Sequence, residues 1–413
     1  MKNLKFKIAV IGISLLSINA FAQDYVYKGI KNVEATIGMN NSESDSDQET
    51  VSEDCYDPAN IGKKGTAQGC EGLLIVDNNI LRDLVLEKTY TISETESVSS
   101  YADTAIFTGQ VTDMSYLFCN LNNSYYPECT LKDPIYSILN WNTENVIDMS
   151  YMFMYSTYNQ PLNSWNVSNV TDMSNMFYNS AYNQPLDNWN VSNVTDMRDM
   201  FRDSAYNQTL NNWNVSNVTD MSHMFRDSAY NQPLNNWNVS NVTNMSWMFY
   251  KSSYNHPLNN WKVGNVTDMS NMFYRSVYNQ PLDNWNVSNV TDMGYMFRGS
   301  AYNQPLDNWN MSNVTDMRGI FRNSAYNQLL NNWNVSNVTN MGYMFYNSAY
   351  NQPLNNWDVS NVTDMHSMFR NSAYNQNISD WCVPTISTKP PNFDLNSGFE
   401  NQTQLQPNWG SCP

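Results

Sequence analysis

Apolar residues recur along this chain at a fixed interval of 24 residues, and the tryptophans mark the interval most clearly. From Trp141 onward a Trp follows at every 24th residue as far as Trp381, which defines ten full units over residues 141–380. A representative unit, residues 165–188, reads WNVSNVTDMSNMFYNSAYNQPLDN. A repeat of this length is typical of an array in which each unit buries its apolar face against the next one. We therefore expect one cooperative body and not ten separate domains.

The pattern within each unit predicts a short strand followed by a short helix. When Trp is numbered as position 1, the join between units reads Leu-x-x-Trp-x-Val, as in Leu186, Trp189 and Val191. That spacing is typical of a solenoid strand whose alternate side chains point inward. Asn169 at position 5 is expected to cap a helix, and Asp172 at position 8 to lie in its first turn, where the helix dipole favours negative charge. The predicted fold class is an α/β repeat.

One face of the predicted helix is apolar and should form the core. At 100° per residue, positions 6, 9, 12, 13 and 16 share a face, and the example unit places these residues there: Val170, Met173, Met176, Phe177 and Ser180. A stripe of Met and aromatic residues at this spacing is typical of a core and not of a cofactor site, so no cofactor is predicted. Residues 182–185 (YNQP) then predict a turn that returns the chain to the next strand.

The amino terminus has the pattern of a secretory signal over residues 1–22. Lys2, Lys5 and Lys7 precede an apolar run over residues 8–16, and residues 20–22 (AFA) have the small-x-small form of a cleavage site. No later stretch approaches the roughly 20 apolar residues that a membrane span requires. We therefore expect an exported protein without a transmembrane segment after signal removal, located at the cell surface or outside the cell, with the periplasm as the alternative.

The remaining residues outside the ten units predict an acidic segment and two caps. Residues 23–70 should form an acidic, partly disordered segment, with residues 41–54 (NSESDSDQETVSED) as a flexible linker. Residues 71–105 are predicted to form an amino-terminal cap, and residues 106–140 a degenerate first repeat with an insertion. Residues 381–413 then form the carboxy-terminal cap, because an array of this kind needs atypical end units to shield its core.

Six cysteines suit an oxidising compartment and permit fifteen pairings. Pairing between sequence neighbours is the simplest arrangement, and it predicts disulfide-bonded caps: Cys55 with Cys70, Cys119 with Cys129, and Cys382 with Cys412. The chain has no C-x-x-C pair, and its three histidines lie far from the cysteines in the sequence, so no metal site is predicted.

Positions 10, 11, 14 and 15 differ between otherwise similar units and should point away from the core. Positions 11 and 14 supply thirteen candidate binding residues: Tyr151, Tyr178, Arg202, Arg226, Trp247, Tyr250, Tyr274, Tyr295, Arg298, Arg322, Tyr343, Tyr346 and Arg370. Tyr, Trp and Arg are enriched at binding hot spots. The same side chains could equally stack on one another and hold neighbouring units together.

Two further columns of polar residues have a ligand-binding and a structural interpretation. Positions 23, 24 and 2 are almost all Asn or Asp, as in Asp187, Asn188 and Asn190. On stacked strands they would bind a periodic ligand such as a polysaccharide, or bond one another along the ladder. Position 8 is usually acidic and could offer oxygen ligands to calcium, but acids at helix starts require no metal.

Charge and repetition exclude several functional classes. The chain has 21 basic and 38 acidic residues, and removing the three lysines of the leader leaves 18 against 38, a net charge of −20. Binding to nucleic acid or to an anionic membrane is therefore not expected. Catalysis needs a nucleophile, a base and an oxyanion donor that converge once in space, whereas the polar residues here recur uniformly. We do not expect an enzyme.

The repeat closely resembles that of the BspA-like family of bacterial leucine-rich-repeat surface proteins. The similarity covers residues 111–380 through the pattern WNVSNVTDMSxMFxxSAYNQPLNN, and residues 381–384 (WCVP) and 409–413 (WGSCP) resemble the family's end caps. The resemblance implies a leucine-rich-repeat solenoid that is displayed on the cell or released from it. It also implies adhesion to host matrix proteins or to other bacteria, and it supplies no catalytic residues. The expected partner is therefore a host matrix or cell-surface protein, or a glycan.

Two hypotheses for the function follow. In the first, an exported solenoid recognises a protein or glycan partner through an extended face. In the second, the chain is a structural or spacing element of the cell surface without a specific ligand. A polysaccharide-binding protein that uses the Asn and Asp positions is the intermediate case.

Overall fold

The computed structural model describes residues 51–101, 105–120, 133–134 and 138–413. These residues belong to one compact unit, Glu49–Pro413. The predicted leader and residues 23–50 of the acidic segment lie outside the described residues. No helix within the described ranges is long and apolar enough to cross a membrane.

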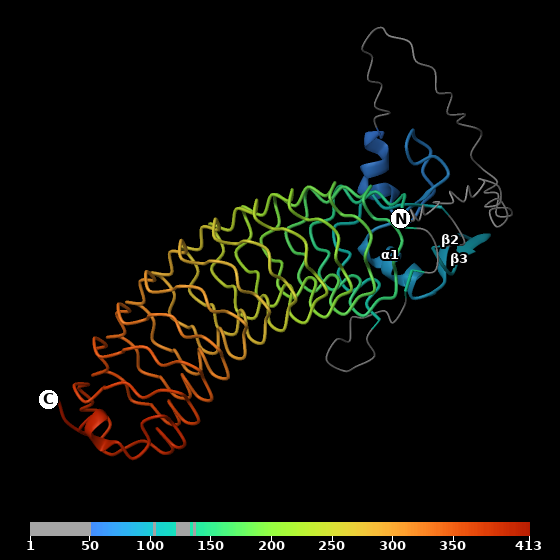
Figure 1. Ribbon diagram of the computed structural model, residues 1–413. Helices are drawn as coiled ribbons and strands as arrows, with labels where there is room; N and C mark the ends of the chain where they lie inside the picture. The colour runs from blue at the N-terminus through green and yellow to red at the C-terminus, as the bar shows by residue number, and fades with distance from the viewer. Residues whose placement is uncertain (1–50, 102–104, 121–132, 135–137) are drawn as a thin grey trace, which may run out of the picture. The chain divides into compact units, whose positions relative to one another are not determined.

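The 24-residue units lie side by side in register, and position 8 forms the column that joins them. Parallel bridges connect Asp148 to Asp172 and Asp172 to Asp196, and the series continues at the same interval to Asp364. One further bridge joins Asp113 of the degenerate first repeat to Asp148, so the insertion does not break the pairing. Figure 1 shows the resulting stack of coils. The tandem repeats expected from the tryptophan interval are therefore present.

Backbone hydrogen bonds in positions 9–16 alternate between neighbouring units and local turns. The N–H groups at positions 9, 11, 13 and 15 donate to carbonyl groups of the next unit, as from Asn175 to Arg198 at 2.9 Å. The N–H groups at positions 12, 14 and 16 bond three residues back within their own unit, as from Tyr178 to Asn175 at 3.1 Å. Each unit thus supplies the acceptors for its neighbour.

The predicted short helix is wrong in every repeat unit that the structure describes. An α-helix needs each backbone N–H to donate to the carbonyl four residues back in the same segment. In positions 9–16, however, half of the N–H groups donate to carbonyl groups of the next unit. Positions 11 and 15 also have positive φ, for example 59° at Asn175 and 49° at Asn179. Asn169 does not cap a helix, since its Nδ2 donates to the Glu144 carbonyl of the preceding unit at 2.6 Å. Asp172 instead accepts the Ser174 N–H in a local turn at 2.8 Å.

The predicted strand at the Leu-x-x-Trp-x-Val join is also absent from the described units. Positions 23 and 24 form a turn there, and the pairing between units lies at position 8 instead. The tryptophans nevertheless join the units, because the indole N–H groups from Trp189 to Trp381 each donate to the Leu carbonyl 27 residues earlier, as from Trp189 to Leu162 at 2.9 Å. The apolar side chains do point inward, and Leu186 and Val191 are buried.

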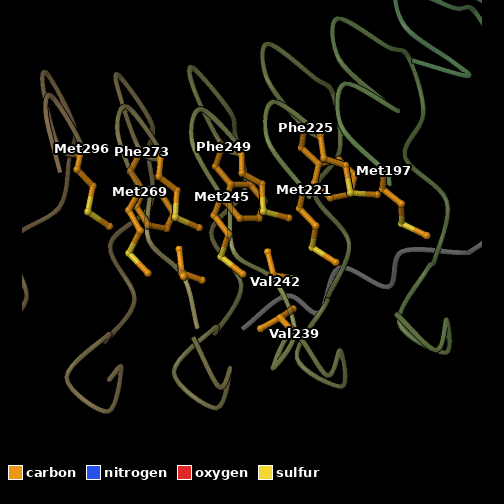
Figure 2. Packing of buried hydrophobic residues seen from close by; sticks show 14 of the residues in the cluster. Met197, Met221, Phe225, Val239, Val242, Met245, Phe249, Met269, Phe273 and Met296 are labelled. Atoms are coloured by element: carbon orange, nitrogen blue, oxygen red, sulfur yellow. The ribbon is translucent and has the colours of Figure 1, made fainter. Parts of the chain in front are cut away.

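The prediction of the core is confirmed. Met173, Met176 and Phe177 have no exposed surface, and the equivalent Met and Phe residues of the other units are buried in the same way. Figure 2 shows these Met and Phe side chains filling the space between successive coils. Phe177 and Phe201 of adjacent units stack with their ring centroids 5.7 Å apart. The period therefore identified the buried positions although the backbone that carries them is not helical.

A second column of aromatic residues at position 18 belongs to the core as well. Tyr182, the first residue of the predicted turn, is fully buried, as are its equivalents through Tyr374. Neighbouring rings of the column stack, with 6.3 Å between the centroids of Tyr182 and Tyr206. Burial raises the pKa of these phenols far above the ordinary value of 10.

The amino-terminal part contains the regular helices and strands. Two short 3₁₀ helices, η1 (Glu53–Tyr56) and η2 (Pro58–Asn60), precede β1 (Leu74–Ile75), α1 (Asn78–Val85), β2 (Tyr90–Ser93), β3 (Glu96–Val98) and β4 (Ile106–Phe107). β1 pairs with β4 in parallel, and β2 with β3 in antiparallel orientation. The amphipathic helix α1 buries its apolar face in the core of the repeats, and its Arg82 donates to the Ser115 carbonyl of the first repeat. Residues 51–54 of the predicted flexible linker belong to this folded part.

The carboxy-terminal part replaces an eleventh unit. The N–H groups of Ser367 and Phe369, in the last unit, donate to Pro391 and Phe393. Phe393 and Phe399 place their edges against Phe369, with centroids 5.4 Å away in each case. One more 3₁₀ helix, η3, spans Thr403–Leu405. The end of the core is thereby covered by aromatic side chains.

Disulfides join Cys55 to Cys70 and Cys382 to Cys412, which are two of the three pairs expected. Cys119 is also disulfide-bonded, and its expected partner Cys129 lies outside the described residues. One disulfide therefore lies in each terminal part of the repeat array.

Candidate functional site

The variable positions 10, 11, 14 and 15 lie together on one face of the repeat array, which we call the variable face. Position 12 points into the core, and positions 11 and 14 on either side of it are in most units only half-buried. The positive φ at positions 11 and 15 turns these side chains away from the core at each step. All thirteen candidate binding residues lie on this face.

Aromatic side chains of the variable face stack across the boundaries between units. Tyr250 and Tyr274 lie parallel with their centroids 4.5 Å apart, and Tyr151 stacks on Tyr116 at 4.4 Å. Trp247 contacts Tyr250 within its own unit at 4.8 Å. The rings therefore form contacts that run from unit to unit.

Arginines of the variable face lie over these rings. The guanidinium carbon of each of the five position-14 arginines is 4.7–5.8 Å from an aromatic centroid. Arg322, for example, lies 4.7 Å from both Tyr343 and Tyr346. A cation over an aromatic ring contributes about 0.5–1 kcal/mol at a partly exposed site. The thirteen candidates thus contact one another or their neighbours on the same face, as the structural interpretation requires.

Two regions of the variable face differ in their charge. In units 3 and 4 (residues 189–236) the arginines have carboxylate partners, such as Arg202 with Asp199 at 3.1 Å and Arg226 with Asp227 at 3.5 Å. In units 6–8 (residues 261–332) the variable positions carry four arginines and no acid. One of the four, Arg318, pairs with Asp316 at position 8. The face is therefore balanced in one region and basic in the other.

Glycines in the basic region make room for side chains of adjacent units. Gly319 occupies position 11 with φ +57°, and a Cβ placed there would come within 2.4 Å of the Tyr295 ring. Gly299 at position 15 would similarly bring a Cβ to 3.1 Å from Cγ of Arg275. The guanidinium groups of Arg298 and Arg318 in turn each lie over the Tyr295 ring, 5.3 Å from its centroid. The side chains of neighbouring units are therefore fitted to one another here.

The sequence interpretation missed several members of this face. Lys251 and Arg275 at position 15, and Arg318 at position 10, also lie over tyrosine rings. The 24-residue period places positions 10 and 15 on the same outward face, so these three residues could have been predicted from the sequence. The candidate binding residues, however, include only positions 11 and 14. His223 at position 11 and His366 at position 10 also belong to the face.

The two histidines have different surroundings. His223 stacks on Trp247 at 5.6 Å, and burial is the main cause that lowers its pKa below the ordinary value of 6.5. His366 lies with Nδ1 2.6 Å from the Asp364 carboxylate and with its ring 4.1 Å from Tyr343. Both rings thus form contacts between units, stacked at His223 and edge-to-face at His366.

The carboxylates of position 8 form a column beside the variable face. Each accepts the backbone N–H two residues on, as Asp292 does from Gly294 at 2.7 Å. Burial is the main cause that raises the pKa of Asp148, Asp196 and Asp292, and neighbouring carboxylates of the column raise it further. Among the residues that the structure describes, no group of three or more His, Cys, Asp or Glu side chains is placed to hold a metal ion.

The Asn and Asp residues of positions 23, 24 and 2 do not lie on a strand, contrary to the expectation. Their side chains bond the backbone, since Asn163 accepts the Asn188 N–H of the next unit at 3.1 Å and Asn190 accepts the Ser192 N–H at 3.2 Å. These amides therefore hold turns and neighbouring units in place through backbone groups, and not by the ladder of amide-to-amide bonds that the structural interpretation predicted.

Comparison with known protein families gives a match over most of the chain. The model of one family matches residues 95–213, 202–304 and 299–407 in three tandem copies, which together span 313 of the 413 residues. No match was found among curated proteins or among solved structures. The repeat units described above fall almost entirely within the matched residues. The chain therefore belongs to the family described as "Mycoplasma protein of unknown function, DUF285".

Proposed function

We propose that this protein is an exported repeat solenoid that recognises a partner through its variable face. The single observation that carries the proposal is that differences between units concentrate at the four outward positions, while nearly every other position repeats. Packing alone does not require Trp247, Lys251 or Arg275 to replace the Asn and Tyr of other units. A surface that varies while its scaffold stays constant is what a recognition function needs.

Further observations support export and recognition. The disulfides and the absence of a membrane-spanning helix among the described residues are compatible with an exported protein. Arg, Tyr and Trp are the residue types that contribute most to binding energy at interfaces. The resemblance to BspA-like repeats implies adhesion to host matrix proteins or to other bacteria, so a matrix or cell-surface protein is the expected class of partner, with a glycan as the alternative.

A structural or spacing role is the alternative, and the contacts within the variable face favour it. Each of the thirteen candidates already contacts a ring or a guanidinium group on that face, so stacking would account for the residue types without a ligand. Polysaccharide binding at positions 23, 24 and 2 has less support, because amide oxygens there are used by the backbone.

A transplantation experiment distinguishes recognition from a structural role. The chain from Gln23, oxidised, is tested for binding to matrix proteins, cell-surface proteins and glycans. In a variant, the four variable positions of units 5–8 are replaced by those of unit 2 (Ser174, Asn175, Tyr178, Asn179), a set that a native unit already accommodates. The control variant exchanges Asn for Ser at position 24 of the same units.

We expect the first variant to stay folded and to lose binding, while the control retains it. Equal binding by both variants would show that the variable face is not the recognition surface. If the unaltered folded chain binds none of the panel, the structural alternative replaces our proposal.

A further inference from the structure

Three arginines in consecutive units stand out because no carboxylate in the described part of the chain forms an ion pair with them. Arg275, Arg298 and Arg322 belong to units 6, 7 and 8, and we call them the arginine strip. None has a carboxylate partner among the described residues, whereas Arg198, Arg202 and Arg226 of units 3 and 4 all do. On a chain with a net charge of −17, a run of unpaired cations on one face is exceptional.

The strip is continuous along the array. The Arg275 N–H donates to the Arg298 carbonyl at 2.7 Å, and the Gly299 N–H donates to the Arg322 carbonyl at 2.8 Å. The three residues therefore sit on adjacent coils of the backbone. Their side chains are exposed at Arg275 and half-buried at Arg298 and Arg322. A linear partner that runs across the coils would meet one guanidinium group at each step.

The rings beneath the strip orient its guanidinium groups. Arg275 and Arg298 lie over Tyr274 at 5.6 and 4.9 Å, and Arg322 lies over Tyr343 and Tyr346 at 4.7 Å. Stacking occupies the face of a guanidinium group and leaves its edge for hydrogen bonds. Nε of Arg298 and Nε of Arg322 are buried without a hydrogen-bond partner, so the Nη groups must serve as the donors to a ligand. Those donors suit the paired oxygens of a sulfate or carboxylate group, which they bind in a bidentate manner. The arrangement is thus prepared for oxyanions before any ligand arrives.

We propose that the arginine strip binds a linear anionic polysaccharide that carries sulfate or carboxylate groups. This inference rests on recognition through the variable face and names the class of partner. A polysaccharide fits better than a folded protein, because the variable positions of units 6–8 contain no aliphatic side chain and the rings of Tyr274 and Tyr295 face guanidinium groups. A protein interface needs an apolar centre. A polyanion needs only a line of donors.

The test uses the oxidised chain from Gln23 and heparin as the sulfated probe, with polygalacturonate as the carboxylated one. Neutral dextran and poly-glutamate serve as the uncharged and peptide comparisons. The test variant replaces the three strip arginines by Gln. The matched control replaces Lys64, Lys88 and Lys389 by Gln, which changes the net charge by the same amount but removes cations that lie outside the variable face and already have carboxylate partners. Circular dichroism and thermal unfolding establish that both variants are folded.

We expect the strip variant to bind heparin at least about tenfold more weakly than the unaltered chain, and the control to change by less than about twofold. Binding should also weaken as salt rises from about 50 to about 500 mM, because the contacts are ionic. Arg→Lys changes in the strip test the geometry if the Gln variant fails to fold. They keep the charge and lose the planar fork, so we expect them to weaken binding as well, by a smaller factor.

Equal losses in the strip variant and the control would overturn the proposal, as would binding to poly-glutamate alone or to neither anionic polysaccharide. Those results leave the wider proposed function standing if the transplanted variant still loses another partner from the panel. Failure of both experiments would reject the variable face as a recognition surface.

Discussion

The contact between Gly319 and Tyr295 provides a sharp test of how the variable face is built. Replacing Gly319 by Ala adds one methyl group at a backbone with φ +57°, and that methyl would lie 2.4 Å from the ring of Tyr295. The left-handed conformation costs an L-residue roughly 1–2 kcal/mol relative to glycine. Forcing a packed ring to move costs about 1–3 kcal/mol more. We therefore expect Gly319→Ala to lower the free energy of unfolding by about 2–5 kcal/mol.

A double-mutant cycle separates the two causes. In a Tyr295→Ala background the ring is gone, so Gly319→Ala should cost only the conformational part. The coupling between the two substitutions should then be about 1–3 kcal/mol. Denaturant unfolding followed by tryptophan fluorescence measures all four proteins, and an unchanged slope with denaturant verifies that the same structure unfolds in each. Coupling of less than about 0.5 kcal/mol would refute the view that Gly319 accommodates this ring.

Three further predictions concern the core, the carboxylate column and the caps. Trp261→Phe removes the indole N–H that donates to the Leu234 carbonyl at 3.0 Å and leaves a small void, so denaturant unfolding should show a loss of about 2–4 kcal/mol. Burial raises the pKa of Asp292 in the folded protein above its unfolded value of 3.8. The contribution of Asp292 to the free energy of unfolding is therefore most favourable below pH 3.8, and it declines as the pH rises through the folded-state pKa. Asp292→Asn should therefore stabilise the protein more at about pH 7 than at about pH 3 in urea titrations. Reducing the Cys382–Cys412 disulfide opens a loop with a sequence separation of 30 and should cost about 3–4 kcal/mol, visible as a lower melting temperature with reductant.

The buried positions of the repeat were predictable because they depend only on the period. Met173 and Phe177 recur at the same place in every unit, and a residue that never varies in an array is one that packing controls. Tyr182 was missed because the polar residues that follow it have the pattern of a turn. Its burial depends on the Tyr rings of adjacent units, which a single unit does not display.

The backbone of the repeat was not predictable in the same way. The spacing of positions 6, 9, 12, 13 and 16 fits a helix. The backbone instead forms hydrogen bonds between units, which exist only once the units are stacked and which a single unit does not reveal. Asn175 and Asn179 carried a hint, since Asn tolerates positive φ better than most residues. For the candidate site, the outward direction of position 14 could be predicted from the period. The partner of each arginine could not, because Arg298 contacts the ring of Tyr274 in the preceding unit.

The left-handed backbone at positions 11 and 15 limits which side chains the variable face can acquire. Side chains branched at Cβ are strongly disfavoured in that conformation, and none of the twenty residues at these positions in the ten units is Val, Ile or Thr. Duplication of a unit followed by substitution can therefore introduce charges, amides, aromatic rings or glycine, but not branched aliphatic residues. Positions 11 and 15, which are half of the variable positions, are thus restricted to polar, aromatic and small residues, whichever partner the protein evolves to bind.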